Sequence, residues 1–124
     1  MIASRLAAAA ALSLLFSVPT AASPPGQTIV MWSFGFAPNP IRLAAGQPIT
    51  LTFQNRSGSS HDFTAKQFFA SSRITSGAAA EGEIELKPHE TKSLTLIPRA
   101  GTYKAHCTHF FHEPLGMSDT IFVN

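Results

Sequence analysis

Residues 101–123, GTYKAHCTHFFHEPLGMSDTIFV, hold two β-type segments with a loop rich in soft-metal donors between them. Apolar and polar residues alternate from Tyr103 to Cys107, which is the period of a half-buried strand. The segment TIFV at residues 120–123 consists of β-forming residues. Cys107, the single cysteine of the chain, therefore ends one predicted strand, and Met117 directly precedes the next.

The rest of the chain repeats this period of two in short segments separated by turn residues. In PITLTFQN, residues 48–55, Ile49, Leu51 and Phe53 share one face. Gly, Pro, Asn and Ser mark the turns, and such spacing indicates a β-sandwich or barrel. We expect an all-β fold, a single Greek-key β-sandwich of about seven or eight strands. The strands are expected in TIVMWSF (28–34), residues 48–55, EIEL (83–86), TKSLTLI (91–97), GTYKAHCT (101–108) and TIFV (120–123).

The segment from Lys66 to Ala80 does not follow the β pattern. A helical turn or an irregular crossover is expected there. Its two adjacent aromatic residues, Phe68 and Phe69, should be buried.

The first 22 residues have the layout of a secretory signal peptide. One basic residue, Arg5, precedes an apolar run at residues 6–18, and small residues follow. The run is shorter than the ~20 residues that a membrane-spanning helix needs. With residues 1–22 removed, residues 23–124 form one domain, which we expect in the periplasm without membrane insertion.

A single thiol in an oxidising compartment needs protection. Cysteines there usually pair, but Cys107 has no second cysteine within the chain. This excludes a CxxCH haem attachment, a CxxC redox pair and an iron–sulfur cluster held by cysteines of this chain alone. Ligation of a copper ion would protect the thiol.

The Cys-x4-His-x4-Met spacing of Cys107, His112 and Met117 indicates a metal site. If the loop folds back between the two strands, an imidazole and a thioether approach the thiolate. One more histidine from a distant loop completes a trigonal His₂Cys set with a weak axial thioether, the arrangement of blue-copper sites. His61 is the best candidate, because NRSGSSHDF follows directly after a predicted core strand. One copper ion, as Cu(I) or Cu(II), is the expected cofactor.

Together these segments resemble the cupredoxins, in particular the small periplasmic type related to plastocyanin, azurin, rusticyanin and auracyanin. FAPNPIRLAAGQPITLTFQN (36–55) is similar to the second and third strands of the family. HDF (61–63) is similar to its first-histidine loop, and residues 101–123 to its Cys–His–Met hairpin. The resemblance implies a type 1-like copper site with the ligands His61, Cys107, His112 and Met117.

The chain departs from the common cupredoxin pattern at three places. Phe110–Phe111 precede His112, where many relatives have a Pro-Gly type of turn, and His109 adds an imidazole. Asp62 stands where relatives often have Asn. We expect His109 to be a surface or neighbouring group rather than a ligand. Asn55 and Asp62 either tie the two ligand loops together or serve ordinary turn chemistry.

The leading function is transfer of single electrons by a periplasmic copper protein that is not an enzyme. The alternative is copper handling, that is, sequestration or delivery in copper homeostasis. A third hypothesis is an enzyme with a Cys–His nucleophile pair, but no orienting group or oxyanion motif accompanies the pair in the sequence. In a zinc site of Cys-His₂ type the methionine would have no purpose. A multicopper oxidase needs more domains than residues 23–124 can hold.

The expected partner is a redox protein that docks transiently near His112, or a copper donor or acceptor. Apolar residues flank that histidine and suit such docking, and the protein is expected to be a monomer. The lysines are dispersed along the chain and form no basic run, so no nucleic-acid-binding surface is expected. The flanking residues are Phe110, Phe111, Pro114 and Leu115.

Overall fold

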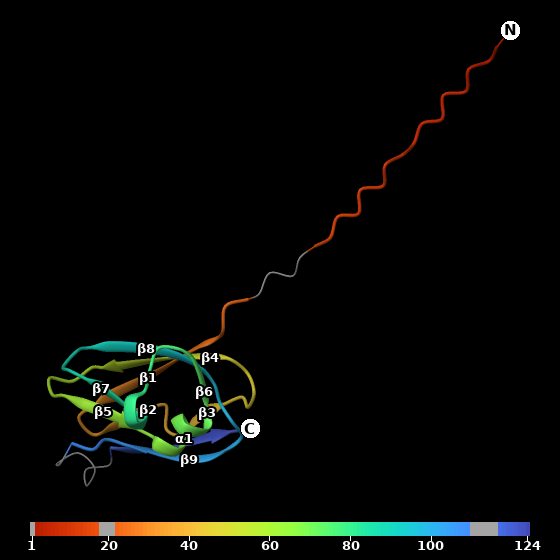
Figure 1. Cartoon of the computed structure of the whole chain (residues 1–124). Helices are drawn as coiled ribbons and strands as arrows, with labels where there is room; N and C mark the ends of the chain where they lie inside the picture. The colour runs from red at the N-terminus through yellow and green to blue at the C-terminus, as the bar shows by residue number, and fades with distance from the viewer. Residues whose placement is uncertain (1, 18–21, 110–116) are drawn as a thin grey trace.

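The computed structural model describes residues 2–17, 22–109 and 117–124, and its folded part is a sandwich of two five-stranded sheets (Figure 1). Residues 2–17 form neither helix nor strand. No helix in the described ranges has the length and apolar character needed to cross a membrane. The strands are β1 (Gly26–Trp32), β2 (Gly35–Ala37), β3 (Ile41–Leu43), β4 (Ile49–Asn55), β5 (His61–Thr64), β6 (Arg73–Ser76), β7 (Glu83–Leu86), β8 (Thr91–Ile97), β9 (Gly101–His106) and β10 (Ser118–Val123).

The order of strands is β2-β1-β4-β8-β6 in one sheet and β3-β10-β9-β5-β7 in the other. β1 runs parallel to β4, and β3 runs parallel to β10, while the other pairs are antiparallel. Neighbours such as β4 and β8 are far apart in sequence, so the connections cross between the sheets as in Greek-key sandwiches.

The predicted all-β sandwich is confirmed, but the described residues form ten strands rather than seven or eight. β2 and β3 have three residues each, which is too short for an alternating pattern to be visible in the sequence. β5, HDFT, is buried at all four positions and therefore does not alternate. The strands predicted at EIEL and TKSLTLI have the predicted bounds.

The core lies between the sheets and contains a cluster of aromatic rings. Leu51 and Phe53 of β4 are buried, as the alternation predicted. The Phe63 ring of β5 has its centroid 5.3 Å from that of Phe36 and 5.0 Å from that of Phe53. Such pairs contribute about 0.5–1.5 kcal/mol each beyond the burial of their surface. Phe63 therefore anchors β5, including the histidine at its start, against the opposite sheet.

The segment after β5 forms the short helix α1 (Lys66–Ser71), which agrees with the helical turn expected there. Phe68 and Phe69 are 0% and 4% exposed, so the predicted burial of both is confirmed. The ring of Phe68 also packs edge-on against Tyr103 of β9, with centroids 5.5 Å apart. The helix thus covers one flank of the core.

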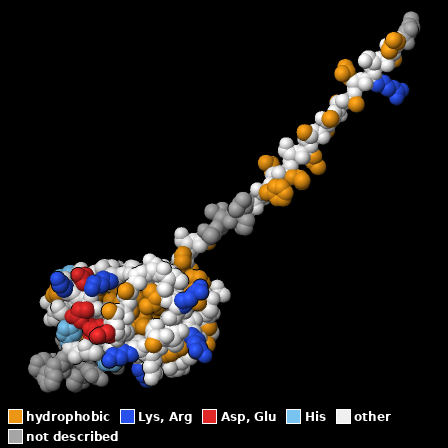
Figure 2. All heavy atoms as spheres, viewed as in Figure 1, with side chains coloured by type: hydrophobic (Ala, Val, Ile, Leu, Met, Phe, Trp, Pro, Cys, Tyr) orange, Lys and Arg blue, Asp and Glu red, His pale blue; other side chains and the backbone are white. Residues whose placement is uncertain are grey.

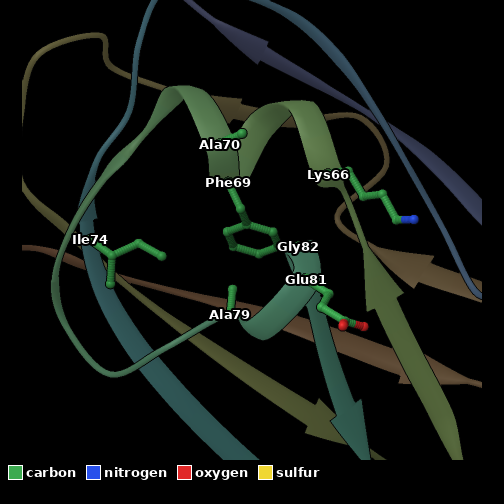
Figure 3. A pocket seen from close by; sticks show the side chains of 7 residues that line it. All are labelled: Lys66, Phe69, Ala70, Ile74, Ala79, Glu81 and Gly82. Atoms are coloured by element: carbon green, nitrogen blue, oxygen red, sulfur yellow. The ribbon is translucent and has the colours of Figure 1, made fainter.

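A hollow of about 640 Å³ lies between α1 and the 3-10 helix η1 (Ala80–Gly82). The Phe69 ring points into it, while the charged ends of Lys66 and Glu81 point away from that ring (Figure 3). Gly82 is required here, because its φ is +73° and a Cβ would lie 2.6 Å from the Cα of Lys66. The residues that line the hollow include no histidine or cysteine.

Three of the predicted donor residues, His61, Cys107 and Met117, lie at one end of the sandwich. β4, β7 and β9 end there, and β5 and β10 begin there. His61, the first residue of β5, pairs with Leu86, the last residue of β7. His106, the last residue of β9, pairs with Ser118, the first residue of β10. We call this end of the sandwich the donor end.

Candidate metal centre

Cys107 follows β9 and is fully buried. Its backbone N–H donates a hydrogen bond to the carbonyl oxygen of Met117, 3.0 Å away. Met117 is also fully buried and directly precedes β10. This bond closes the base of the loop between β9 and β10, and it holds the thiol residue opposite the thioether residue.

His61 is fully buried and lies in β5, rather than in the preceding loop where the sequence pattern placed it. Its pairing with Leu86 of β7 makes it part of the sheet. The Nδ1 atom of His61 lies 3.8 Å from the Sγ atom of Cys107. With metal–ligand bonds of about 2.0–2.3 Å, two ligands of a trigonal ion are separated by nearly this distance. The separation therefore fits donors that share one metal ion.

The Asn55 side chain organises the turn that leads into β5. Its Nδ2 donates to the carbonyl oxygens of Ser59 (2.7 Å), Leu86 (3.3 Å) and Lys87 (3.0 Å). Its Oδ1 accepts from the backbone N–H and the hydroxyl of Ser57, at 3.0 and 2.9 Å. Asn55 thus ties the histidine-bearing turn to the end of β7, and its hydrogen-bond partners among the described residues do not include Cys107, Thr108 or His109.

The Asp62 carboxylate joins β5 to the segment after the cysteine. Oδ1 accepts from the backbone N–H of Thr108 at 2.5 Å, and Oδ2 accepts from the Thr108 hydroxyl. The Thr64 hydroxyl also donates to Oδ2, at 3.1 Å. Burial by itself raises the pKa of Asp62, but hydrogen bonds with Thr108, Cys107 and Glu83 together outweigh it and lower the pKa. The sequence left open whether Asp62 links the two donor segments or serves ordinary turn chemistry. These hydrogen bonds show that it links them.

The sulfur of Cys107 is in a setting that suits a bound metal and not a nucleophile. Burial raises the pKa of the Cys107 thiol to about 12. A nucleophilic cysteine has a lowered pKa and partial exposure, so the Cys–His nucleophile reading does not fit. A bound metal ion deprotonates a coordinating thiol outright. The backbone N–H of Asp62, 3.4 Å from Sγ, is placed to stabilise the resulting thiolate.

His109 lies beside this centre and is partly exposed. Its Nε2 is 3.0 Å from Oε1 of Glu85 on β7, and its ring centroid is 6.3 Å from that of His61. Donor atoms of Asp62, Cys107 and His109 lie within 4.8 Å of one another. His109 thus lies beside Cys107 with its imidazole against the Glu85 carboxylate, and its place outside the ligand set stays a prediction.

The acidic residues of β7 are the part of the site that sequence reasoning missed. Donor oxygens of Asp62, Glu83 and Glu85 lie within 4.8 Å of one another. The hydrogen bond with Asp62, followed by burial and the charges of Asp62 and Glu85, raises the pKa of Glu83 to about 7. The alternation in EIEL places both glutamates on one face, but it does not reveal that β7 pairs with β5.

The structure thus brings together three of the four predicted ligand residues. His61 and Cys107 are in contact, and Met117 is buried and bonded through its backbone to Cys107. His112, with the apolar residues around it, lies outside the described residues, so its role stays a prediction.

Comparisons with known proteins agree with this architecture. A family model described as a cupredoxin-like domain matches residues 5–117. A comparison with curated protein sequences gives no match.

Several solved structures share the fold. The auracyanin of Roseiflexus castenholzii is 22% identical with a TM-score of 0.61, over 84% of this chain and 99% of that chain. Auracyanin A, a "blue" copper protein from Chloroflexus aurantiacus, is 24% identical with a TM-score of 0.56, over 80% of this chain and 99% of that chain. A multicopper oxidase from Campylobacter jejuni is 15% identical with a TM-score of 0.63, over 86% of this chain but 32% of that chain.

Proposed function

Because this chain belongs to the cupredoxin family, we propose that it is a mononuclear copper protein that carries single electrons. The observation that carries the proposal is the buried pair of Cys107 and His61, whose Sγ and Nδ1 atoms lie 3.8 Å apart. The family and the auracyanin neighbours indicate a single copper ion as the cofactor. A thiolate, imidazoles and a thioether form a donor set that suits copper.

The proposed ligands come from two parts of the chain. β5 supplies His61, and the connection between β9 and β10 supplies Cys107, His112 and Met117, with the thioether as the weak axial ligand. When bound, copper supplies the Cu(I)/Cu(II) couple. The chain holds the donors in place, excludes water from the thiolate and directs the Asp62 N–H at the sulfur.

The way in which the donors are held supports electron transfer. The Asp62–Thr108 hydrogen bonds fix the two donor segments to each other, and Asn55 fixes the turn before β5. A carrier works best when its donors move little between Cu(I) and Cu(II), and this network favours such rigidity. The proposal includes no enzymatic activity.

We place the protein in the periplasm, where it would donate electrons to, or accept them from, a protein that docks transiently near His112. The signal-peptide layout of residues 1–22 supports export.

Copper handling is the second candidate function, and one observation favours it. The side chain of His109 is 34% exposed and lies beside the buried Cys107. An imidazole in that position suits the capture or release of a copper ion at the surface.

Copper titration followed by redox cycling distinguishes the two functions. The protein should bind one copper ion, and oxidation should produce an intense thiolate-to-copper absorption band. Repeated reduction and oxidation should then proceed with a Cu(I) chelator present and without loss of the band. Prompt loss of copper from the reduced form to the chelator would favour copper handling.

A further inference from the structure

Two large apolar side chains of the sandwich are exposed to solvent. Trp32 is 41% exposed and Phe34 is 62% exposed, and the other exposed large hydrophobic residues in the described ranges all lie within residues 2–17. Both belong to the turn between β1 and β2, where Trp32 pairs with Gly35. Tryptophan and phenylalanine are enriched in protein interfaces, so this pair marks a contact surface.

The turn between β1 and β2 lies at the donor end (Figure 1). β1 runs parallel to β4 with Met31 opposite Asn55, so both strands end there. The backbone N–H of Arg56 donates to the Met31 carbonyl at 2.8 Å, just before the turn that leads to β5. After β2, the Asn39 side chain donates to the carbonyl of Ser118 at 3.3 Å, at the start of β10. The aromatic turn is therefore attached to both segments that supply the donors.

Charge is divided between the two edges of this end. No Asp or Glu precedes Asp62 in the chain, and the exposed charged residue beside the aromatic turn is Arg56. On the opposite edge, Glu83 and Glu85 join Asp62 in an acidic group. Figure 2 shows acidic side chains gathered over the region of β7. The first edge is therefore apolar with one arginine, and the second is mainly acidic, with the exposed Lys87 and Lys92 beside its glutamates.

We infer that Trp32, Phe34 and Arg56, here called the β1–β2 patch, form the docking surface for an electron-transfer protein whose own docking face is apolar with an acidic rim. This inference rests on the proposed function and names the class of its partner. The aromatic rings exclude water from the contact, and Arg56 attracts the acidic rim. The excess of acidic over basic residues on the opposite edge disfavours binding of the same rim there.

Docking can be measured without electron transfer, because Trp32 is the single tryptophan of the chain. A c-type cytochrome with an acidic haem edge is titrated into the protein, and a basic c-type cytochrome of similar potential serves as the comparison. The acidic cytochrome should quench Trp32 emission saturably, and the quenching should weaken as ionic strength rises. Equal or stronger quenching by the basic cytochrome would overturn the inference.

A matched pair of charge variants tests the role of Arg56. Arg56→Glu should weaken binding of the acidic cytochrome by about tenfold, since it reverses the charge at the contact. Arg99→Glu makes the same change in net charge in the turn between β8 and β9, at the opposite end, and should leave binding within about twofold of the wild type. Equal effects of the two variants would show that only net charge matters.

The aromatic residues are tested by the rate of electron transfer. Trp32→Ala and Phe34→Ala should lower the rate at which the acidic cytochrome oxidises the reduced copper protein by about fivefold or more. Oxidation by hexacyanoferrate(III) and the visible copper band should not change. An unchanged cytochrome rate would refute the role of the patch. A change in Trp32 emission with protein concentration alone would identify a second copy as the occupant instead.

Failure of the wild-type protein to exchange electrons with hexacyanoferrate would contradict the proposed function. The inferred docking surface would still be judged separately by the quenching of Trp32.

Discussion

The backbone N–H of Asp62 is directed at the sulfur of Cys107 across 3.4 Å, although the two residues belong to separate segments of the chain. The Asp62 side chain at the same time accepts two hydrogen bonds from Thr108, the residue that follows the cysteine. A single residue thus contacts the thiol and also fixes the segment that carries it. Changes at Asp62 should therefore alter both the charge around the metal and the position of the thiolate.

The first prediction concerns the thiolate. Cys107→Ser should abolish the intense visible band of the copper-loaded protein, because a hydroxyl is a poor substitute for a thiolate donor. Visible absorption after copper titration measures this. His61→Ala should open a coordination position that added imidazole can fill. A Cys107→Ser protein that keeps the band would refute the blue-copper assignment.

The second prediction concerns the charge of Asp62. Asp62→Asn should raise the reduction potential by tens of millivolts, because a nearby negative charge stabilises Cu(II) more than Cu(I) and the variant removes it. Asparagine can still accept from the Thr108 N–H, so the link between the segments is kept. Voltammetry measures the potential, with Glu81→Gln as a charge-matched control on η1. An unchanged or lower potential in Asp62→Asn would contradict the electrostatic argument.

The third prediction concerns stability and pH. The pKa of Glu83 is raised from 4.5 to about 7, so the folded state binds more protons than the unfolded state in this range. The free energy of unfolding should therefore fall as pH rises from about 4.5 to about 7. Glu83→Gln should remove much of this loss, and Glu81→Gln should not. Urea unfolding of the copper-free protein at pH 5 and pH 7.5 tests this.

Asp62 acts in the opposite sense. Its pKa is lowered, so its contribution to stability is present at neutral pH and is lost as the pH falls through the folded pKa, below the usual value of 3.8. The two effects therefore fall in separate pH ranges.

The fourth prediction concerns the turn before β5. Asn55→Ala should lower the free energy of unfolding by roughly 2–4 kcal/mol, because several buried hydrogen bonds are lost and backbone carbonyls are left without their donor. Asn39→Ala removes one exposed hydrogen bond and should cost less than about 0.5 kcal/mol. Urea unfolding measures both. Similar losses in the two variants would mean that Asn55 is not an organising residue.

The sequence was sufficient to predict the sandwich and the approach of Cys107 to His61. Alternating burial is visible where one face of a strand is buried and the other is less so, as in β4 and β8. The Cys-x4-His-x4-Met spacing and the position of His61 after a core strand indicated a shared metal ion. The sequence did not reveal the neighbours of the site. Glu85 meets His109 only because of the register of β7 against β5 and of β5 against β9. Turn geometry and packing set that register, and local pattern does not.

The backbone hydrogen bond between Cys107 and Met117 marks the boundary between the paired strands β9 and β10 and the loop that connects them. β9 and β10 are paired from His106 and Ser118 onward, so the sheet itself fixes the two ends of the connection. Residues can be added or exchanged between these ends at a small cost in loop-closure entropy, about 0.6 kcal/mol for each doubling of length. The chain therefore carries an interchangeable segment on a constant scaffold, and the properties of the metal centre can be altered without redesign of the fold.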